Sequence, residues 1–191
     1  MCKKMFLMRH GETLFNTQHR IQGWCDSPLT ENGKKQAIKA KKYFEREDII
    51  FDHAYCSTSE RTEDTLKIVC DMPYQRLKEL KEMNYGFLEG QPELKLTPKQ
   101  CETYYLDFGG ESSNTVKNRM YHILTEIMQK NTHQCVLIVG HGAACFNFLR
   151  AIQDPTEELK KGFGNGTIFE YDFDDGIFSL KKVIRQDDME D

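Results

Sequence analysis

The hexapeptide CVLIVG, Cys135–Gly140, is the feature that most narrows the fold of this chain. Its apolar, largely β-branched residues run without a polar break and end at a glycine. A strand with one solvated face alternates apolar and polar side chains, whereas a continuous apolar run is typical of a parallel sheet buried on both faces. The run therefore predicts an α/β fold with helices on both sides of the sheet.

Other segments fit the same architecture. Three candidate strands are Lys4–Met8, Phe51–Cys56 and Arg76–Leu80. Cap residues and apolar stripes predict helices from Thr30 through Phe44, from Ser57–Ser59 through Val69, from Ser112 or Ser113 through Ile127, and from Phe146 to Ile152. The segments TIFEYDF and IFSLKKV flank Asp174-Asp175-Gly176 and predict a C-terminal β-hairpin. Residues 185–191 are expected to form a solvated, frayed tail.

Together these elements predict a three-layer α/β/α sandwich with a mostly parallel central sheet, in one domain that spans residues 1–191. Glycines and prolines break the pattern between Tyr85 and Gly110, so we expect a short cap or insert at about 86–111. The hydrophobic fraction of 39% is enough to build a core.

Composition excludes several functions. A net charge of -4 provides no global basic field for nucleic acid, so an anionic ligand would need local cations. No apolar run is long enough to span a membrane or to act as a secretory signal. Seven cysteines without a C-x-x-C pair predict reduced thiols, no zinc site and a cytoplasmic protein. Nothing in the sequence indicates an oligomer, and that question stays open.

Histidine and arginine recur where two predicted strands end. His10 follows the first strand beside Arg9, His141 follows CVLIVG, and Arg61 lies just after the second strand. Ligand sites in open α/β sheets gather beyond the carboxyl ends of the strands, so these side chains are expected to face one crevice. Guanidinium groups bind phosphate through a planar fork of donors.

Glycine follows both histidines, at Gly11 and Gly142. Glycine lets backbone N–H groups approach an anion closely, and a helix N-terminus adds its dipole. The simpler interpretation of any one of these residues is a core or surface position, and we give it to the four other histidines, His19, His53, His122 and His133.

Six blocks in order along the chain resemble the histidine phosphatase superfamily, also called the phosphoglycerate mutase-like family. They are LMRHGETLFN (7–16), RIQGWCDSPLTENGKKQA (20–37), CSTSERTEDT (56–65), LKEMNYGFLEG (80–90), GGES (109–112) and VLIVGHGA (136–143), and NGTI (165–168) matches a loop near the family's site. One motif of this kind has a high false-positive risk, whereas a collinear set does not.

The resemblance implies a role for each matched residue. His10 would be the nucleophile that accepts the phosphoryl group, and Glu82 would protonate the leaving group and then activate water. Arg9, Arg61 and His141 would complete the catalytic phosphate pocket. Further substrate contacts would come from Asn16, Gln22, Gly23 and Gly142, with Gly11 beside the anion. Glu79 is out of register with the acid block and is interpreted as a surface residue.

These roles agree with elementary acid–base chemistry. An imidazole with a reference pKa of about 6.5 is a competent nucleophile near neutrality, and the adjacent Arg9 disfavours its charged form. No cofactor and no metal ion is implied. One departure from the family pattern concerns the residue after the second arginine, where the family often has alanine and this chain has Thr62.

Hydrolysis is preferred over a mutase reaction. Mutases of the family carry a longer basic insert, whereas here about eighteen residues separate Gly90 from Gly109, and their only cations are Lys95 and Lys99. A small phosphate ester is the expected partner. Its organic part could contact aromatic residues, which could equally be packing residues: Phe15, Trp24, Tyr85, Tyr104, Tyr105 and Phe108. The sequence thus favours a metal-independent phosphomonoesterase. A phosphoglycerate mutase and a non-catalytic module that binds a phospho-ligand or protein are the alternatives.

Overall fold

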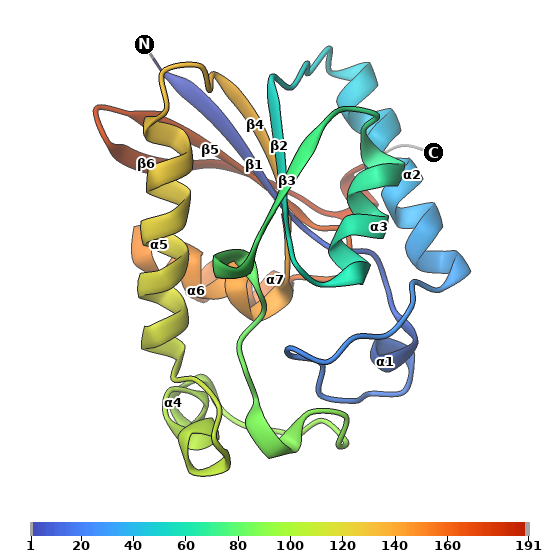
Figure 1. Cartoon of the computed structure of the whole chain (residues 1–191), viewed down its shortest axis with the longest axis vertical. Coiled ribbons are helices and arrows are strands. Elements are labelled where there is room, and N and C mark those ends of the chain that lie inside the picture. The colour runs from blue at the N-terminus through green and yellow to red at the C-terminus, as the bar shows by residue number, and fades with distance from the viewer. Residues whose placement is uncertain (1, 190–191) are drawn as a thin grey trace.

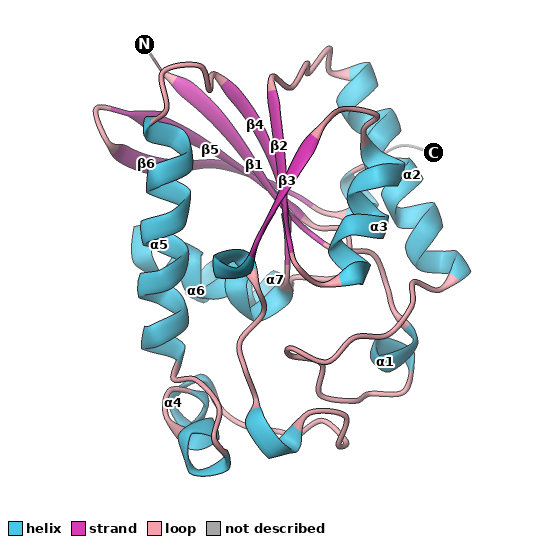
Figure 2. Ribbon diagram, viewed as in Figure 1, coloured by secondary structure: helices cyan, strands magenta, loops and turns pink. Residues whose placement is uncertain are grey.

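The computed structural model describes residues 2–189, which form a six-stranded sheet in the order β3-β2-β4-β1-β5-β6 (Figures 1 and 2). Its strands are β1 (Lys3–Arg9), β2 (His53–Ser57), β3 (Tyr74–Leu77), β4 (Cys135–Gly140), β5 (Ile168–Asp174) and β6 (Ile177–Ile184). The β3-β2-β4-β1 part is parallel, and β5 and β6 add antiparallel to β1. The fold is therefore the expected α/β architecture with a mostly parallel sheet.

The helices are α1 (Leu14–Thr17), α2 (Glu31–Arg46), α3 (Glu60–Val69), α4 (Pro98–Cys101), α5 (Ser113–Gln129), α6 (Gly142–Ile152) and α7 (Thr156–Lys161). Figure 1 shows α2 and α3 on one side of the sheet and α5 and α6 on the other. The predicted cap residue Thr30 accepts a hydrogen bond from Gly33 N at 3.0 Å at the start of α2. Ser112 does the same for Thr115 N at the start of α5.

Successive side chains of the central strands face two apolar cores in turn. In β4, Val136 and Ile138 face the core beneath α5 and α6, while Leu137 and Val139 face the core beneath α2 and α3. Successive side chains of a strand point to opposite faces, so a strand buried on both faces must be apolar at every position. This is the physical reason for the continuous run in CVLIVG.

The C-terminal hairpin forms at the expected turn. Asp175 and Gly176 both adopt positive φ angles, 48° and 80°, as the tight turn between β5 and β6 requires. The predicted frayed tail is wrong for its described part. Met189 is only 3% exposed and packs in the core beneath α2, after a 3₁₀ turn at Gln186–Asp188.

Two predicted boundaries are corrected as well. The strand expected at residues 76–80 lies at Tyr74–Leu77, and Lys78–Leu80 form a 3₁₀ turn. The helix expected from Phe146 begins at Gly142, directly after His141. The second correction matters for function because it places a helix N-terminus at the end of β4. Short helices α1, α4 and α7 carry too few residues for a periodic signal.

Two further findings concern the whole described chain. All seven cysteines have free thiols. None of the helices within residues 2–189 combines the length and apolar composition that a membrane span requires.

Candidate active site

His10 and His141 lie together beyond the ends of β1 and β4. Their ring centroids are 5.4 Å apart, in an edge-on arrangement with 69° between the planes. Both are buried, with 3% and 0% exposure. The two strands are neighbours in register, Arg9 opposite Gly140, so the residues that follow them leave the sheet side by side.

Arg61, in the first turn of α3, joins the two imidazoles. Its Nε donates to His10 Nε2 at 3.2 Å, and one terminal nitrogen donates to His141 Nδ1 at 2.9 Å. The remaining donors bind Gly23 O at 2.8 Å, Cys25 O at 3.0 Å and Asp26 Oδ1 at 2.8 Å. All five donors of this buried guanidinium are therefore satisfied by the protein. A phosphoryl group that binds Arg61 must replace one or both imidazoles.

The hydrogen bonds of His10 fix its protonation. Arginine has no acceptor, so the Nε2 atom that faces it carries the lone pair, and Nδ1 carries the proton that it donates to Gly11 O at 2.8 Å. Burial holds the pKa of His10 well below its usual range, and the nearby charges of Arg61 and Arg9 lower it further. The ring is thus neutral, with Nε2 as its nucleophilic atom.

The guanidinium of Arg9 keeps one donor without a protein partner. One terminal nitrogen donates to Phe163 O, while its Nε is buried without any hydrogen-bond partner. Leaving a buried polar donor unpaired is costly, and such groups in a native site commonly await a ligand. A methyl group on Gly142 would come within 3.3 Å of this guanidinium, so glycine lets Arg9 lie flat against the start of α6.

The carboxylate of Glu82 lies at the N-terminus of α6. Its carboxylate accepts hydrogen bonds from Met83 N at 2.8 Å, Ala143 N at 2.9 Å and Ala144 N at 2.8 Å. Burial raises its pKa, and these backbone donors oppose the rise. A buried carboxyl with a raised pKa keeps its proton to higher pH than an exposed one and can release it to a leaving group.

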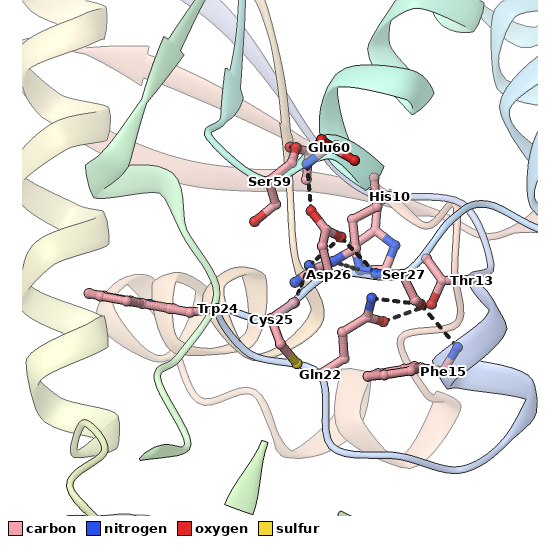
Figure 3. A network of polar contacts seen from close by, with 12 residues as sticks. His10, Thr13, Phe15, Gln22, Trp24, Cys25, Asp26, Ser27, Ser59 and Glu60 are labelled. Atoms are coloured by element: carbon pink, nitrogen blue, oxygen red, sulfur yellow. Dashed lines mark hydrogen bonds and ion pairs between the residues drawn. The ribbon is translucent and has the colours of Figure 1, made fainter. Parts of the chain in front are cut away.

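A polar network supports the strand-end loop (Figure 3). Thr13 Oγ1 donates to Gln22 Oε1 at 2.7 Å, and the Gln22 amide donates to Ser27 Oγ at 3.0 Å. Asn165, in the predicted NGTI loop, bridges His10 O at 3.2 Å and Asn16 Oδ1 at 3.1 Å. The amides of Gln22 and Asn16 are therefore held in fixed orientations.

The site borders a cavity of about 440 Å³. Seven predicted site residues line it: Arg9, His10, Asn16, Gln22, Glu82, Tyr85 and Gly142. Arg61, His141 and Gly23 lie directly behind them, where Gly23 supplies a carbonyl to Arg61. Gly11 has a packing role in the structure, and its place beside the anion stays a prediction. A methyl group there would come within 2.4 Å of Gly33 O, and its N–H donates to Thr65 Oγ1, so this glycine serves loop packing.

The aromatic candidates divide into two groups. Tyr85 and Tyr105 line the cavity and also pack edge-on against each other, with centroids 4.6 Å apart. Trp24 instead donates from Nε1 to Glu82 O at 3.0 Å and thereby holds the backbone of the acid. Phe15, Tyr104 and Phe108 are not among the lining residues.

Several lining residues were missed by the sequence analysis. The wall and mouth of the cavity also include Arg20, Ile21, Glu93, Leu94, Ala143, Phe146, Leu159 and Phe163. Arg20, Ile21 and Ala143 lie within matched blocks but were given no role, and no motif marks the others, which come from loops and from α6 and α7. Asp26, which pairs with Arg61, lay within a matched block but has no local signal of its own.

Comparison with known proteins places the chain in a family. The sequence model of the histidine phosphatase superfamily (branch 1) matches residues 5–185. A 2,3-bisphosphoglycerate-dependent phosphoglycerate mutase of Buchnera aphidicola subsp. Cinara cedri is 36% identical over 138 residues, which are 67% of this chain and 60% of the mutase. An uncharacterized phosphatase PhoE of Bacillus subtilis is 31% identical over 157 residues, 81% of this chain and 79% of that protein.

A solved structure is similar over nearly the whole chain. It is a phosphoserine phosphatase mutant of Entamoeba histolytica in complex with phosphoserine, 26% identical, with a TM-score of 0.81 over 96% of this chain and 97% of that chain. The protein therefore belongs to the histidine phosphatase superfamily, branch 1. The superfamily's enzymes similar to this chain include both phosphatases and phosphoglycerate mutases.

Proposed function

We propose that this protein is a metal-independent phosphomonoesterase that hydrolyses small phosphate esters through a phosphohistidine intermediate on His10. The observation that carries the proposal is the neutral His10, which lines the cavity together with Arg9, whose buried Nε has no hydrogen-bond partner. A nucleophile and an unsatisfied cationic donor at one end of a cavity suit a phosphoryl group.

The reaction has two steps. His10 Nε2 attacks phosphorus, the ester P–O bond breaks, and the Glu82 carboxyl gives its proton to the departing alcohol oxygen. Water then attacks the phosphohistidine, Glu82 accepts the proton of that water, and the P–N bond breaks to release phosphate. Arg9 and Arg61 stabilise the charge on the phosphoryl oxygens, as cations do in other phosphoryl transfers, and His141 completes the phosphate pocket.

The outer part of the cavity supports hydrolysis over mutase activity. Apart from the predicted site residues, its lining is largely aromatic and aliphatic and includes the acid Glu93 and the cation Arg20, while Lys95 and Lys99 do not line it. A carboxylate at the mouth opposes a second anionic group on the substrate, which a phosphoglycerate would bring.

A phosphoglycerate mutase is the second candidate. Arg20 is a cation at the mouth and could hold a carboxylate, and the Buchnera relative carries the mutase name. A non-catalytic phospho-ligand or protein-binding module is less well supported, because a binder gains nothing from a buried acid with a raised pKa at the pocket.

Hydrolysis of a panel of phosphate esters, including an aryl phosphate, tests the proposal directly. We expect phosphate release without added metal and in the presence of a strong chelator, together with an acid-labile phosphoryl group on the protein that is absent from His10→Ala. Efficient interconversion of phosphoglycerates primed by a bisphosphate, with little ester hydrolysis, would favour the mutase instead. The cytoplasmic location stays a prediction from the cysteine pattern.

A further inference from the structure

Two buried hydroxyl groups lie behind His141, on the side away from Arg61. Ser57, the last residue of β2, places Oγ 2.7 Å from His141 Nε2, and Thr62 of α3 places Oγ1 3.0 Å from the same Ser57 oxygen. Ser57, Thr62 and His141 are each 0% exposed. Groups buried so completely have no water to complete their hydrogen bonds, so the protein atoms alone decide their directions.

The directions follow from Arg61. Because Arg61 can only donate, His141 Nδ1 is an acceptor, and the neutral ring carries its proton on Nε2 and donates it to Ser57 Oγ. Ser57 Oγ also accepts from Ser59 N at 3.1 Å, so its two lone pairs are occupied. Its own hydrogen then goes to Thr62 Oγ1, and Thr62 donates onward to Ser59 O at 2.7 Å.

We propose that Thr62 is a positioning residue for His141: by accepting the Ser57 hydroxyl hydrogen it keeps Ser57 Oγ an acceptor, so that His141 holds its proton on Nε2 and presents the lone pair of Nδ1 to the phosphoryl site. The proposal rests on the proposed function for its catalytic meaning. Its structural half, the tautomer of His141, stands without it.

The residue type at position 62 is decisive in this arrangement. An alanine or valine there could not accept a hydrogen bond, and the remaining partner for the Ser57 hydroxyl hydrogen would be His141 Nε2. The ring would then be driven to carry its proton on Nδ1, where two donors, the ring N–H and Arg61, would face each other. Thr62, where the family often has alanine, accepts the Ser57 hydroxyl hydrogen, so two donors do not face each other at Nδ1.

The tautomer determines which form of a phosphate is preferred. A phosphoryl oxygen that displaces Arg61 from Nδ1 meets a lone pair, so it binds as P–O–H, which donates its hydrogen to Nδ1. The charged groups that face His141 are Arg61 of α3, Arg9 at the end of β1 and Arg119 of α5, with His10 as the titratable neighbour. Burial and, after it, these cations hold the pKa of His141 well below its usual range. The ring is therefore neutral in the free protein, and the hydrogen comes from the monoanionic phosphate.

A matched pair of variants tests the inference. Thr62→Val removes the hydroxyl and keeps the volume, whereas Thr62→Ser keeps the hydroxyl and removes a methyl group. Ring ¹⁵N NMR of His141 in the free protein should show the Nε2–H tautomer for the wild type and Thr62→Ser, and a large Nδ1–H population for Thr62→Val. Identical tautomers in the two variants would overturn the proposal.

Binding of inorganic phosphate provides the second readout and needs no turnover. Because inorganic phosphate is mainly the monoanion at pH 5.5 and mainly the dianion at pH 8, the wild type and Thr62→Ser should bind it more tightly at pH 5.5. For Thr62→Val we expect about a tenfold weaker affinity at pH 5.5, the scale of one buried hydrogen bond, and a smaller difference between the two pH values. Equal losses in both variants would show a packing effect and contradict the proposal.

Ser57→Ala is the third variant, and it provides the test if Thr62→Val does not give a dispersed NMR spectrum. It removes the hydroxyl whose hydrogen would otherwise turn towards His141 Nε2, so Arg61 alone should hold the ring in the Nε2–H tautomer. In the Ser57→Ala background Thr62→Val should then add nothing, because the two residues act as one unit. A protein with the predicted tautomers but no esterase activity would refute the proposed function alone, whereas an active enzyme with an unchanged tautomer in Thr62→Val would refute this inference alone.

Discussion

The Nε atom of Arg61 donates to Nε2 of His10 at 3.2 Å, so the nitrogen that would attack phosphorus is covered by the cation that would bind the phosphoryl group. Burial, together with this contact, keeps the His10 ring neutral, and the contact orients its Nε2 lone pair towards Arg61. It also means that a substrate must compete with the imidazole for Arg61. Exchange of the neutral imidazole for a charged phosphoryl oxygen is favourable, because hydrogen bonds between charged groups are the stronger kind.

Removal of the nucleophile gives the most direct test. His10→Ala should lower kcat/KM for an aryl phosphate by roughly a thousandfold or more, because no other lining residue offers a lone pair at that position. The matched control is His122→Ala on the exposed face of α5, which should leave turnover unchanged. Near-normal hydrolysis by His10→Ala would show that another group attacks phosphorus.

Replacement of the acid should depend on the leaving group. Glu82→Gln cannot donate a proton, so alkyl phosphates should lose roughly 100-fold or more in kcat, while aryl phosphates with good leaving groups lose much less. Glu79→Gln, three residues earlier and exposed, is the control. Equal losses for both classes of ester would remove Glu82 as the general acid.

The raised pKa of Glu82 also predicts a pH dependence. The first step needs the protonated carboxyl, so kcat for an alkyl phosphate should fall as the pH rises through the pKa of Glu82. An ordinary exposed carboxyl would impose this fall near pH 4.3, and the buried one should impose it at higher pH. A pH–rate profile of the wild type measures it, and Glu82→Gln should lack that limb of the profile.

The ion pair behind the site should control affinity for the phosphoryl group. Asp26→Asn leaves the fully buried Arg61 without its carboxylate partner, which lies 2.8 Å away. We expect the free energy of unfolding to fall by up to about 3 kcal/mol and KM to rise, because an unpaired buried charge is costly and Arg61 loses its fixed position. Urea unfolding and steady-state kinetics measure the two effects. The same substitution at the exposed Asp71 should change neither.

The acid at the cavity mouth should affect selectivity. Glu93→Gln removes a half-exposed negative charge, so esters with a carboxylate, such as 3-phosphoglycerate, should gain about two- to fivefold in kcat/KM relative to a neutral aryl phosphate. Glu45→Gln on α2, far along the chain from the cavity residues, is the control. An unchanged ratio would show that Glu93 does not contact the organic part of the substrate.

A buried histidine far from the site should make the fold sensitive to acid. His133 is 3% exposed, stacks on His53 with centroids 3.6 Å apart, and faces the Tyr55 hydroxyl at 2.6 Å. Burial and the neighbouring His53 and Lys130 lower its pKa to about 4. The unfolded chain therefore takes up this proton below about pH 6.5, whereas the folded protein takes it up only near pH 4.

Stability should accordingly fall as the pH decreases from 6.5 towards 4, with His133 contributing about 3 kcal/mol of the loss at most. Urea unfolding at pH 7 and pH 4.5 should show a smaller difference for His133→Gln than for the wild type. His122→Gln, on a surface residue, should retain the full difference. If His133→Gln retains it too, the acid sensitivity has another source.

Much of the fold could be predicted because its signals are local. The unbroken apolar run of β4 indicates burial on both faces, and the Asp-Gly turn requires the positive φ angles that permit a hairpin. Placement of His10 and His141 at strand ends follows from the same reasoning, because parallel neighbours end at one edge. The register of the weak edge strand β3 could not be predicted, because only β2 pairs with it and its alternation of apolar residues is poor.

The sequence by itself thus determined the sheet, its two apolar faces and the residues that gather at its edge, because backbone geometry and side-chain periodicity act over a few residues. Only the tertiary structure decided that every N–H of Arg61 donates to a protein atom and that Gly11 packs on Gly33. It also decided that Arg9 donates to the carbonyl oxygen of Phe163. Those facts depend on contacts between segments far apart in the chain. Their geometry is set by how the loops pack over the sheet, and no local pattern of residues encodes it.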